Sequence, residues 1–274
     1  MRRGCSRPAR RAFFGAALAT AFAAMAVCVP AGAAACDRPL YLTFDTGHMG
    51  VAQLVADVLA RQQVKATFFL ANEKTRGGGA SLDDAWAPWW KARAAEGHAF
   101  GSHTFDHVYW LADRPGGGFR VRPSAGPTTG VAADWSAAQY CAELQRPAER
   151  FQAMTGRPMT PPSQPALFRA PGGKTSPALL AAAAACGWRH VPWSAAGFLG
   201  DELPSERYSN PVLLQRALRD VRPGDILLAH LGIHSRKEPW APAVLEPLIV
   251  GLKARGHCFA TLREHPRYGA HSGS

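Results

Sequence analysis

The chain has 274 residues, of which 47% are hydrophobic and 19% charged, a balance typical of a globular protein with an apolar core. It carries 31 Lys and Arg against 20 Asp and Glu, so its formal net charge is +11. The basic residues form no block long enough for a nucleic-acid surface, and we expect no nucleic-acid partner.

Residues 1–35 have the pattern of a cleaved export signal. Five arginines and no acid lie in residues 1–11, an uncharged alanine-rich stretch follows up to Val29, and Ala31-Gly32-Ala33 fits a cleavage site. The apolar stretch is shorter than the roughly 20 residues of a membrane span, so we expect no transmembrane span in the mature protein. Arg10-Arg11, followed by Ala-Phe-Phe, also fits a twin-arginine signal. The protein is therefore predicted to be exported, to the periplasm or the medium.

The mature chain keeps 26 basic residues against 20 acidic ones, a formal net charge of +6, and four cysteines: Cys36, Cys141, Cys186 and Cys258. An even number in an oxidising compartment favours one or two disulfides, and three full pairings remain open. Their wide spacing is unlike a zinc knuckle. A lipidated N-terminus at Cys36 is the alternative, although the Leu or Val usual three residues earlier is missing.

Apolar runs alternate with amphipathic stretches over residues 36–266, a length that suits one domain. This alternation is typical of an α/β fold with a parallel sheet, open or closed into a barrel, whose site lies at the carboxyl ends of the strands. We predict strands at residues 40–44, 66–70, 98–101, 167–168, 190–193, 226–229 and 258–261, and helices at residues 51–62, 85–95, 137–154, 177–186, 211–220 and 241–255.

Residues 108–134 interrupt the alternation. They are rich in Gly and Pro, show little periodicity and directly follow His107. An insertion of this length is either a lid or wall of the substrate site, or a disordered surface segment. The tail at residues 267–274 is expected to be disordered.

Four short motifs lie in order along the predicted elements. They read TFDTG at residues 43–47, EGHAFGSHTFDH at residues 96–107, RAPGG at residues 169–173 and LAH at residues 228–230. Together they resemble the NodB-homology polysaccharide deacetylases of carbohydrate esterase family 4, from about residue 40 to residue 262. The resemblance implies a single domain folded as a distorted (β/α) barrel, and an enzyme that removes acetyl groups from N-acetylated sugars of a glycan.

The resemblance also implies catalytic roles. Asp45 would be the general base, Arg169 would hold Asp45 ionised and oriented, and His230 would be the general acid. Taken singly, each residue also fits a structural role, such as a turn cap for Asp45 or a core histidine for His230. The common order of the motifs favours the catalytic reading.

A metal and a substrate pocket are implied in the same way. His103 and His107 would hold a divalent cation, with zinc the expected ion, to polarise the acetyl carbonyl and acidify a water. Gly172, Leu228 and Trp193 would line the substrate, with the Gly172 N–H near the developing oxyanion and Leu228 near the acetyl methyl.

The metal motif departs from the family at Thr46, where the family usually has an aspartate ligand. A neutral hydroxyl is a poor substitute for a carboxylate. Three outcomes fit: a metal held by the two histidines and water, a replacement ligand with His48 nearest in sequence, or no metal. The wording YLTFDTG is closer to the branch of peptidoglycan N-acetylmuramic acid deacetylases, which read YLTFDNG, than to the TFDDG enzymes.

A second departure lies at residues 193–198, WSAAGF, where the family pattern D-x-x-D-W would supply an aspartate that tunes the acid histidine. Asp225 and Asp201 are the candidate replacements.

The sequence therefore predicts an exported deacetylase of N-acetyl sugars in peptidoglycan or another envelope glycan. The alternatives are a glycan-binding pseudoenzyme with an impaired metal site and an O-acetyl esterase.

Overall fold

A curved sheet of seven parallel strands forms the centre of the computed structural model, which describes residues 36–269. The predicted export signal lies outside the described residues. The strand order is β10-β1-β2-β3-β7-β8, and β9 also pairs with β1. The strands are β1 (Pro39–Asp45), β2 (Thr67–Leu70), β3 (Ala99–Ser102), β7 (Ala166–Phe168), β8 (Trp188–His190), β9 (Ile226–His230) and β10 (Cys258–Phe259).

An irregular segment brings the two ends of this sheet together. After β8, the backbone N–H of Ser194 donates to the Ile226 carbonyl at 3.1 Å, and Phe198 forms a parallel bridge with Leu228. The segment thus runs beside β9, whose other edge pairs with β1. The ring is completed by loop backbone rather than by a regular strand, and the predicted distorted (β/α) barrel is confirmed.

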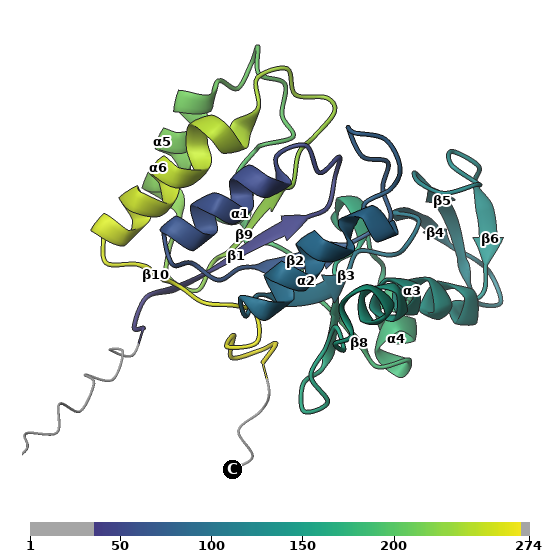
Figure 1. Cartoon of the computed structure of the whole chain (residues 1–274). Helices are drawn as coiled ribbons and strands as arrows, with labels where there is room; N and C mark the ends of the chain where they lie inside the picture. Colours follow the sequence, from purple (N-terminus) through teal and green to yellow (C-terminus); the bar gives the residue numbers. More distant parts are fainter. Residues whose placement is uncertain (1–35, 270–274) are drawn as a thin grey trace, which may run out of the picture. The chain divides into compact units, whose positions relative to one another are not determined.

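Six α-helices cover the outside of the sheet, and each begins and ends within two residues of its predicted bounds (Figure 1). Local signals explain the ends of the longest one: the Ser136 side chain accepts from the Gln139 N–H in a capping box, and Gly156 closes the helix with a φ of 73°. The helices are α1 (Ala52–Arg61), α2 (Ala87–Ala95), α3 (Ala137–Thr155), α4 (Pro177–Ala185), α5 (Asn210–Asp220) and α6 (Trp240–Ala254).

One strand is shifted from its predicted position. We predicted residues 190–193, whereas β8 covers Trp188–His190. The Val191 N–H still donates to the Phe168 carbonyl, but the Val191 carbonyl accepts from the Arg169 side chain at 3.2 Å instead of continuing the ladder. The apolar run therefore outlasts the strand.

Residues 108–134 are folded, so the disordered alternative is wrong. They form an antiparallel sheet of β4 (Val108–Asp113), β5 (Phe119–Pro123) and β6 (Ala133–Trp135), beside α3 in Figure 1. Val108, Phe119 and Val121 are buried in a cluster with residues of α3 and β7. The alternating burial of β5 is the half-buried strand pattern, and it was hidden in the sequence by the surrounding glycines and prolines.

Two disulfides settle the open pairings: Cys36 with Cys258 and Cys141 with Cys186, with Cα–Cα distances of 6.0 and 6.2 Å. The Cys36 sulfur is thus engaged, which argues against the lipidated alternative. Tyr268 is only 3% exposed and its ring lies 4.7 Å from that of His265, so this part of the tail, which we expected to be disordered, packs against the domain. Residues 270–274 of the tail lie outside the described residues.

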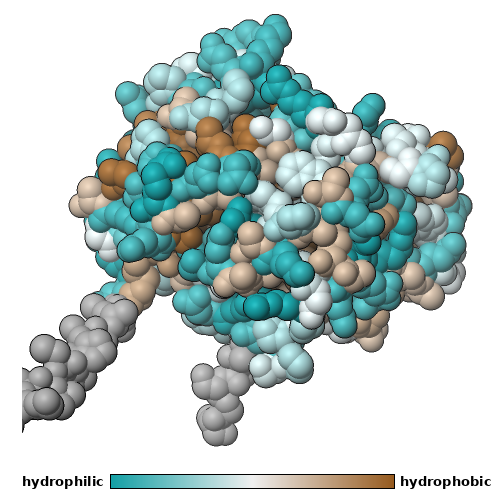
Figure 2. All heavy atoms as spheres, in the orientation of Figure 1, coloured by the Kyte–Doolittle hydropathy of each residue, from teal (hydrophilic) through white to brown (hydrophobic). Residues whose placement is uncertain are grey.

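Within residues 36–269, no helix combines the length and the apolar character needed to span a bilayer. Hydrophilic residues cover most of the face drawn in Figure 2, with smaller apolar areas between them.

Candidate active site

The functional side chains lie at or just past the carboxyl ends of the parallel strands, where the fold was expected to place them. Asp45 ends β1, His103 follows β3, Arg169 follows β7 and His230 ends β9. All but Arg169 line one cavity of about 230 Å³. The other lining residues are Glu73, His107, Tyr109, Ser124, Gly172, Trp193, Glu202, Leu228 and Ile233.

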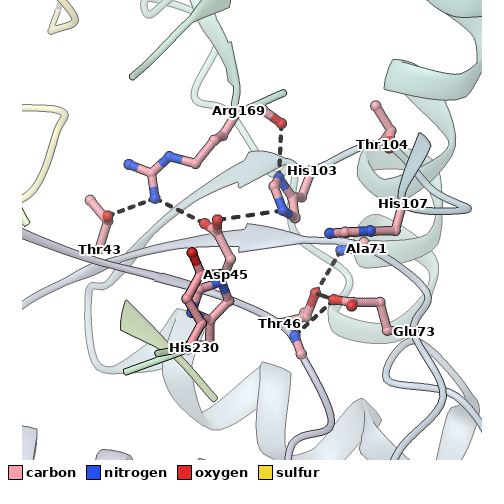
Figure 3. Close-up of polar contacts among 12 residues, drawn as sticks. Thr43, Asp45, Thr46, Ala71, Glu73, His103, Thr104, His107, Arg169 and His230 are labelled. Carbon is pink, nitrogen blue, oxygen red and sulfur yellow. Dashed lines mark hydrogen bonds and ion pairs between the residues drawn. The ribbon is translucent and has the colours of Figure 1, made fainter. Parts of the chain in front are cut away.

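Asp45 is held between a guanidinium and an imidazole (Figure 3). Arg169 donates from one guanidinium nitrogen to Oδ1 of Asp45 at 2.9 Å and to the Thr43 hydroxyl at 2.8 Å. Both side chains of the ion pair are almost fully buried. Burial would raise the pKa of Asp45, but Arg169, His103 and His230 together lower it below its usual value, so the carboxylate is ionised at neutral pH.

His103 has one ring nitrogen anchored and the other free. Its Nδ1 lies 2.8 Å from the Arg169 carbonyl, which can only accept, so Nδ1 carries the proton and Nε2 a lone pair. Nε2 lies 3.4 Å from Oδ2 of Asp45. Burial lowers the pKa of His103 to about 4 despite the nearby carboxylate, so the ring is neutral at neutral pH. The lone pair of His103 Nε2 therefore faces the ionised carboxylate of Asp45, with both side chains buried.

His107 repeats this arrangement. The Ser124 hydroxyl donates to the His107 carbonyl at 3.0 Å, so its oxygen accepts from Nδ1 of the His107 ring, 2.5 Å away. Nε2 of His107 is then the nitrogen left with a lone pair. The rings of His103 and His107 have centroids 4.8 Å apart.

Thr46 contacts a carboxylate that the sequence analysis missed. The Thr46 hydroxyl donates to Oε2 of Glu73 at 2.6 Å, and the Gly47 N–H donates to the same oxygen at 2.7 Å. Burial would raise the pKa of Glu73, but His107, the Thr46 hydroxyl, His103 and the Gly47 N–H lower it. Glu73 lies three residues beyond the end of β2, near the carboxyl end of a strand like the other site residues, and this position was the available signal.

His230 is paired with Asp201, one of the two candidate replacements for the missing motif aspartate. Nδ1 of His230 lies 3.1 Å from each carboxylate oxygen of Asp201. Burial would lower the pKa of His230, but Asp201, with help from Asp45 and Glu202, raises it to about 9. The other candidate, Asp225, accepts from the Arg222 N–H at 2.8 Å and is not a lining residue of the cavity.

His48, which we named as the nearest candidate for a replacement ligand, does not line this cavity. Its Nδ1 accepts from the Gly50 N–H at 2.9 Å, and its ring lies 4.7 Å from that of His234 in a neighbouring cavity. The left-handed turn at Gly47, with a φ of 58°, separates His48 from Thr46 and sends the two side chains to different places.

The predicted substrate residues lie on the walls of the cavity. Gly172 and Gly173 have φ values of 62° and 65°, and a Cβ on them would come within 3.0 Å of the Tyr109 ring and 2.7 Å of the Trp193 ring. Glycine is thus required here by backbone conformation and by close packing. Leu228 supplies an apolar side chain from β9 to the same cavity. Tyr109 and Ser124 come from the folded insertion, which therefore forms part of the wall.

The donor atoms present suit a divalent cation, although they are not preassembled. Two imidazole Nε2 atoms with lone pairs, each opposite an anchored Nδ1, are the usual metal-binding form of histidine. Within residues 36–269, no three His, Cys, Asp or Glu side chains converge closely enough to hold an ion as they stand. The chemistry of the set therefore fits a metal, while the side chains must close on it.

Comparison with known proteins shows which proteins this chain is similar to. A peptidoglycan-N-acetylglucosamine deacetylase of Bacillus cereus is 24% identical over 236 residues, covering 85% of this chain and 90% of the relative. A chitooligosaccharide deacetylase of Azorhizobium caulinodans is 29% identical over 194 residues, covering 70% and 73%. A family 4 acetyl xylan esterase of Clostridium thermocellum, solved with a cobalt ion, has the same fold, with a TM-score of 0.62, 23% identity and coverage of 84% and 91%.

The family model described as polysaccharide deacetylase matches residues 32–191, more than half of the chain. This stretch includes Asp45, Glu73, His103 and Arg169, whereas His230 and Asp201 lie beyond it. The chain belongs to the polysaccharide deacetylase family.

Proposed function

We propose that this protein is an exported deacetylase that hydrolyses the acetamide of N-acetyl sugars in peptidoglycan or another envelope glycan. The observation that carries the proposal is that an ionised carboxylate and a protonated imidazole line one cavity. Asp45 has a lowered pKa and His230 a pKa raised to about 9. Hydrolysis of an amide needs a base for the water and an acid for the leaving amine.

The first proton transfer is assigned to Asp45. In the proposed reaction a water attacks the acetyl carbonyl carbon, and Asp45 takes the proton that the water loses. Arg169 keeps the carboxylate ionised and fixes its plane through the contacts to Oδ1 and to Thr43. The Gly172 N–H is assigned to the oxygen that becomes negative, and Leu228 and Trp193 to the walls around the acetyl methyl.

The second proton transfer is assigned to His230. As the carbon–nitrogen bond breaks, His230 gives a proton to the amine nitrogen, and the products are acetate and a free amino sugar. Because its pKa of about 9 lies above neutral pH, His230 is charged before the reaction begins. Asp201 keeps Nδ1 occupied, so Nε2 is the nitrogen left to face the cavity.

His103 and His107 are the residues that would hold a divalent cation, with zinc the expected ion. Bound there, such a cation would supply a polarised carbonyl and a more acidic water. The contacts of both Nδ1 atoms, with Arg169 and with Ser124, leave Nε2 of each ring as the nitrogen that would bind the ion.

Export is supported by the two disulfides, which are stable in oxidising compartments and rare in the cytosol. The predicted signal at residues 1–35 is consistent with this location.

The test is release of acetate by the purified protein from peptidoglycan, chitin oligomers and acetylated xylan, with and without added metal. We expect acetate from an N-acetylated glycan, and a loss of about 10²–10⁴-fold in Asp45→Asn. Acetate from acetylated xylan alone would support the O-acetyl esterase instead. No acetate from any substrate, together with measurable glycan binding, would support the pseudoenzyme.

A further inference from the structure

The carboxylate of Glu73 faces the same cavity as the two histidines. Its Oε2 accepts from the Thr46 hydroxyl and the Gly47 N–H, and its Oε1 has no hydrogen-bond partner among residues 36–269. A carboxylate partly removed from water is stabilised by a partner of opposite charge. Yet no Lys or Arg of the described chain lies within 4.0 Å of Glu73. One oxygen is thus held by the protein and the other is left for a ligand in the cavity.

Hydrogen bonds hold the backbone around Glu73, so its carboxylate has a defined position at the cavity. The Glu73 N–H donates to the Ser81 hydroxyl at 3.0 Å, and the Ser81 N–H donates back to the Glu73 carbonyl at 2.9 Å. The preceding Asn72 N–H donates to the Phe105 carbonyl at 2.6 Å, which ties the segment to the loop that carries His103 and His107.

Thr46 is the complement of this carboxylate. Its hydroxyl oxygen accepts from the Ala71 N–H at 3.2 Å and its proton goes to Glu73. A carboxylate at position 46 would stand against that of Glu73, and two like charges so close disfavour ionisation of both. A neutral donor at position 46 and a carboxylate at position 73 thus belong together.

We infer that Glu73, with His103 and His107, forms a divalent-cation site in which the acidic ligand has moved from β1 to the end of β2. The role of the ion in this inference rests on the proposed function, whereas the assignment of its ligands rests on the geometry alone. Oε1 of Glu73 and Nε2 of each histidine are the ligating atoms. The three side chains border the cavity without converging, so they close on the ion when it binds.

The experiment is titration of the purified chain with Zn²⁺ by calorimetry, and with Co²⁺ by visible absorption, which reports the coordination of the ion independently of activity. Four variants are compared with the unaltered protein: Glu73→Gln, the double variant Thr46→Asp/Glu73→Gln, His103→Ala, and Glu202→Gln as the matched control. Glu202 lines the same cavity but contacts His230 rather than the metal-binding histidines. Circular dichroism confirms that each variant is folded.

We expect one ion per chain, and a loss of affinity of about 100-fold or more in Glu73→Gln. The double variant should recover affinity to within about tenfold of the unaltered protein, because it restores a carboxylate from β1. The metal affinity of Glu202→Gln should also stay within about tenfold of that of the unaltered protein. Recovery in the double variant also rules out misfolding as the cause of the loss in Glu73→Gln, since both lack the same carboxylate.

Unchanged affinity in Glu73→Gln, with binding abolished in His103→Ala, would overturn the inference. So would an unaltered protein that releases acetate yet binds neither metal at millimolar concentration, and in that case the proposed function would stand. Glu73-dependent binding in a protein that releases no acetate would support the inference and refute the function.

Discussion

Nδ1 of His230 lies 3.1 Å from both carboxylate oxygens of Asp201, and Oδ2 of Asp201 also accepts from the His230 backbone N–H at 2.7 Å. This double contact fixes both the orientation of the ring and its charge. Asp201 thus does for His230 what the missing motif aspartate was expected to do, from a different point in the chain.

Replacing Asp201 by Asn should move the pH profile. Without the negative charge, burial dominates and the pKa of His230 falls from about 9 toward or below its ordinary value of 6.5. The alkaline limb of kcat/KM against pH should therefore shift to lower pH, because the proton donor is lost earlier. Asp225→Asn is the matched control and should leave the limb in place. An unchanged limb in Asp201→Asn would show that His230 is not the acid.

Replacing Arg169 by Met should impair both stability and the base. The variant leaves Asp45 buried without its main partner, and breaking a buried ion pair costs about 3–5 kcal/mol. The pKa of Asp45 should rise, because burial is then opposed only by the histidines, so the acidic limb of kcat/KM moves up. Urea unfolding and a pH profile measure the two effects. Arg169→Lys, which keeps the charge, should show smaller changes in both; equal effects would mean that charge is not the cause.

The charge of His230 should make stability fall at alkaline pH. Its folded-state pKa of about 9 lies above the ordinary 6.5, so the stabilisation is complete below pH 6.5 and is lost as pH rises through 9. A shift of this size corresponds to about 3 kcal/mol. Urea unfolding near about pH 6 and about pH 10 should show a smaller loss in Asp201→Asn than in the unaltered protein. Parallel losses in the two proteins would assign the alkaline destabilisation to other groups.

The two disulfides should differ in what they contribute. Cys36–Cys258 spans 222 residues and Cys141–Cys186 spans 45. On the loop-entropy argument, removal of the first costs about 5 kcal/mol and of the second about 4 kcal/mol. Paired Cys→Ser variants, unfolded in urea under identical conditions, measure both. A negligible loss for the Cys36–Cys258 pair would show that the N-terminal segment is held by β1 and β10 alone.

Most of the helices and strands could be predicted from local sequence patterns. The six helices were predicted to within two residues from patterns along the chain, and the longest one also carries local signals at its ends, the Ser136 cap and Gly156. The strands of the insertion were not predicted, because they are short, are separated by turns at glycines and prolines, and pair only with one another. The end of β8 depends on a distant contact: the Val191 carbonyl accepts from the Arg169 side chain, which an apolar pattern cannot reveal.

Some site residues could likewise be predicted from the sequence and others could not. Asp45, His103, His107, Arg169 and His230 were identified from motifs within single segments, and all five meet in the structure. Glu73 was missed because its role depends on the register of β1 against β2, where Asp45 lies opposite Phe69 and the residues beyond both strands come together. His48 was closer to Thr46 in sequence, but the turn at Gly47 directs it elsewhere.

By itself, the sequence determined the alternation of strands and helices, the order of the motifs and the chemical type of each main site residue, since these depend on neighbours along the chain. Only the tertiary structure decided that Asp201 rather than Asp225 pairs with His230, that Cys36 pairs with Cys258, and that Glu73 stands beside Thr46. Each of these contacts joins segments 26 or more residues apart, and so depends on how the strands pair and where the loops return.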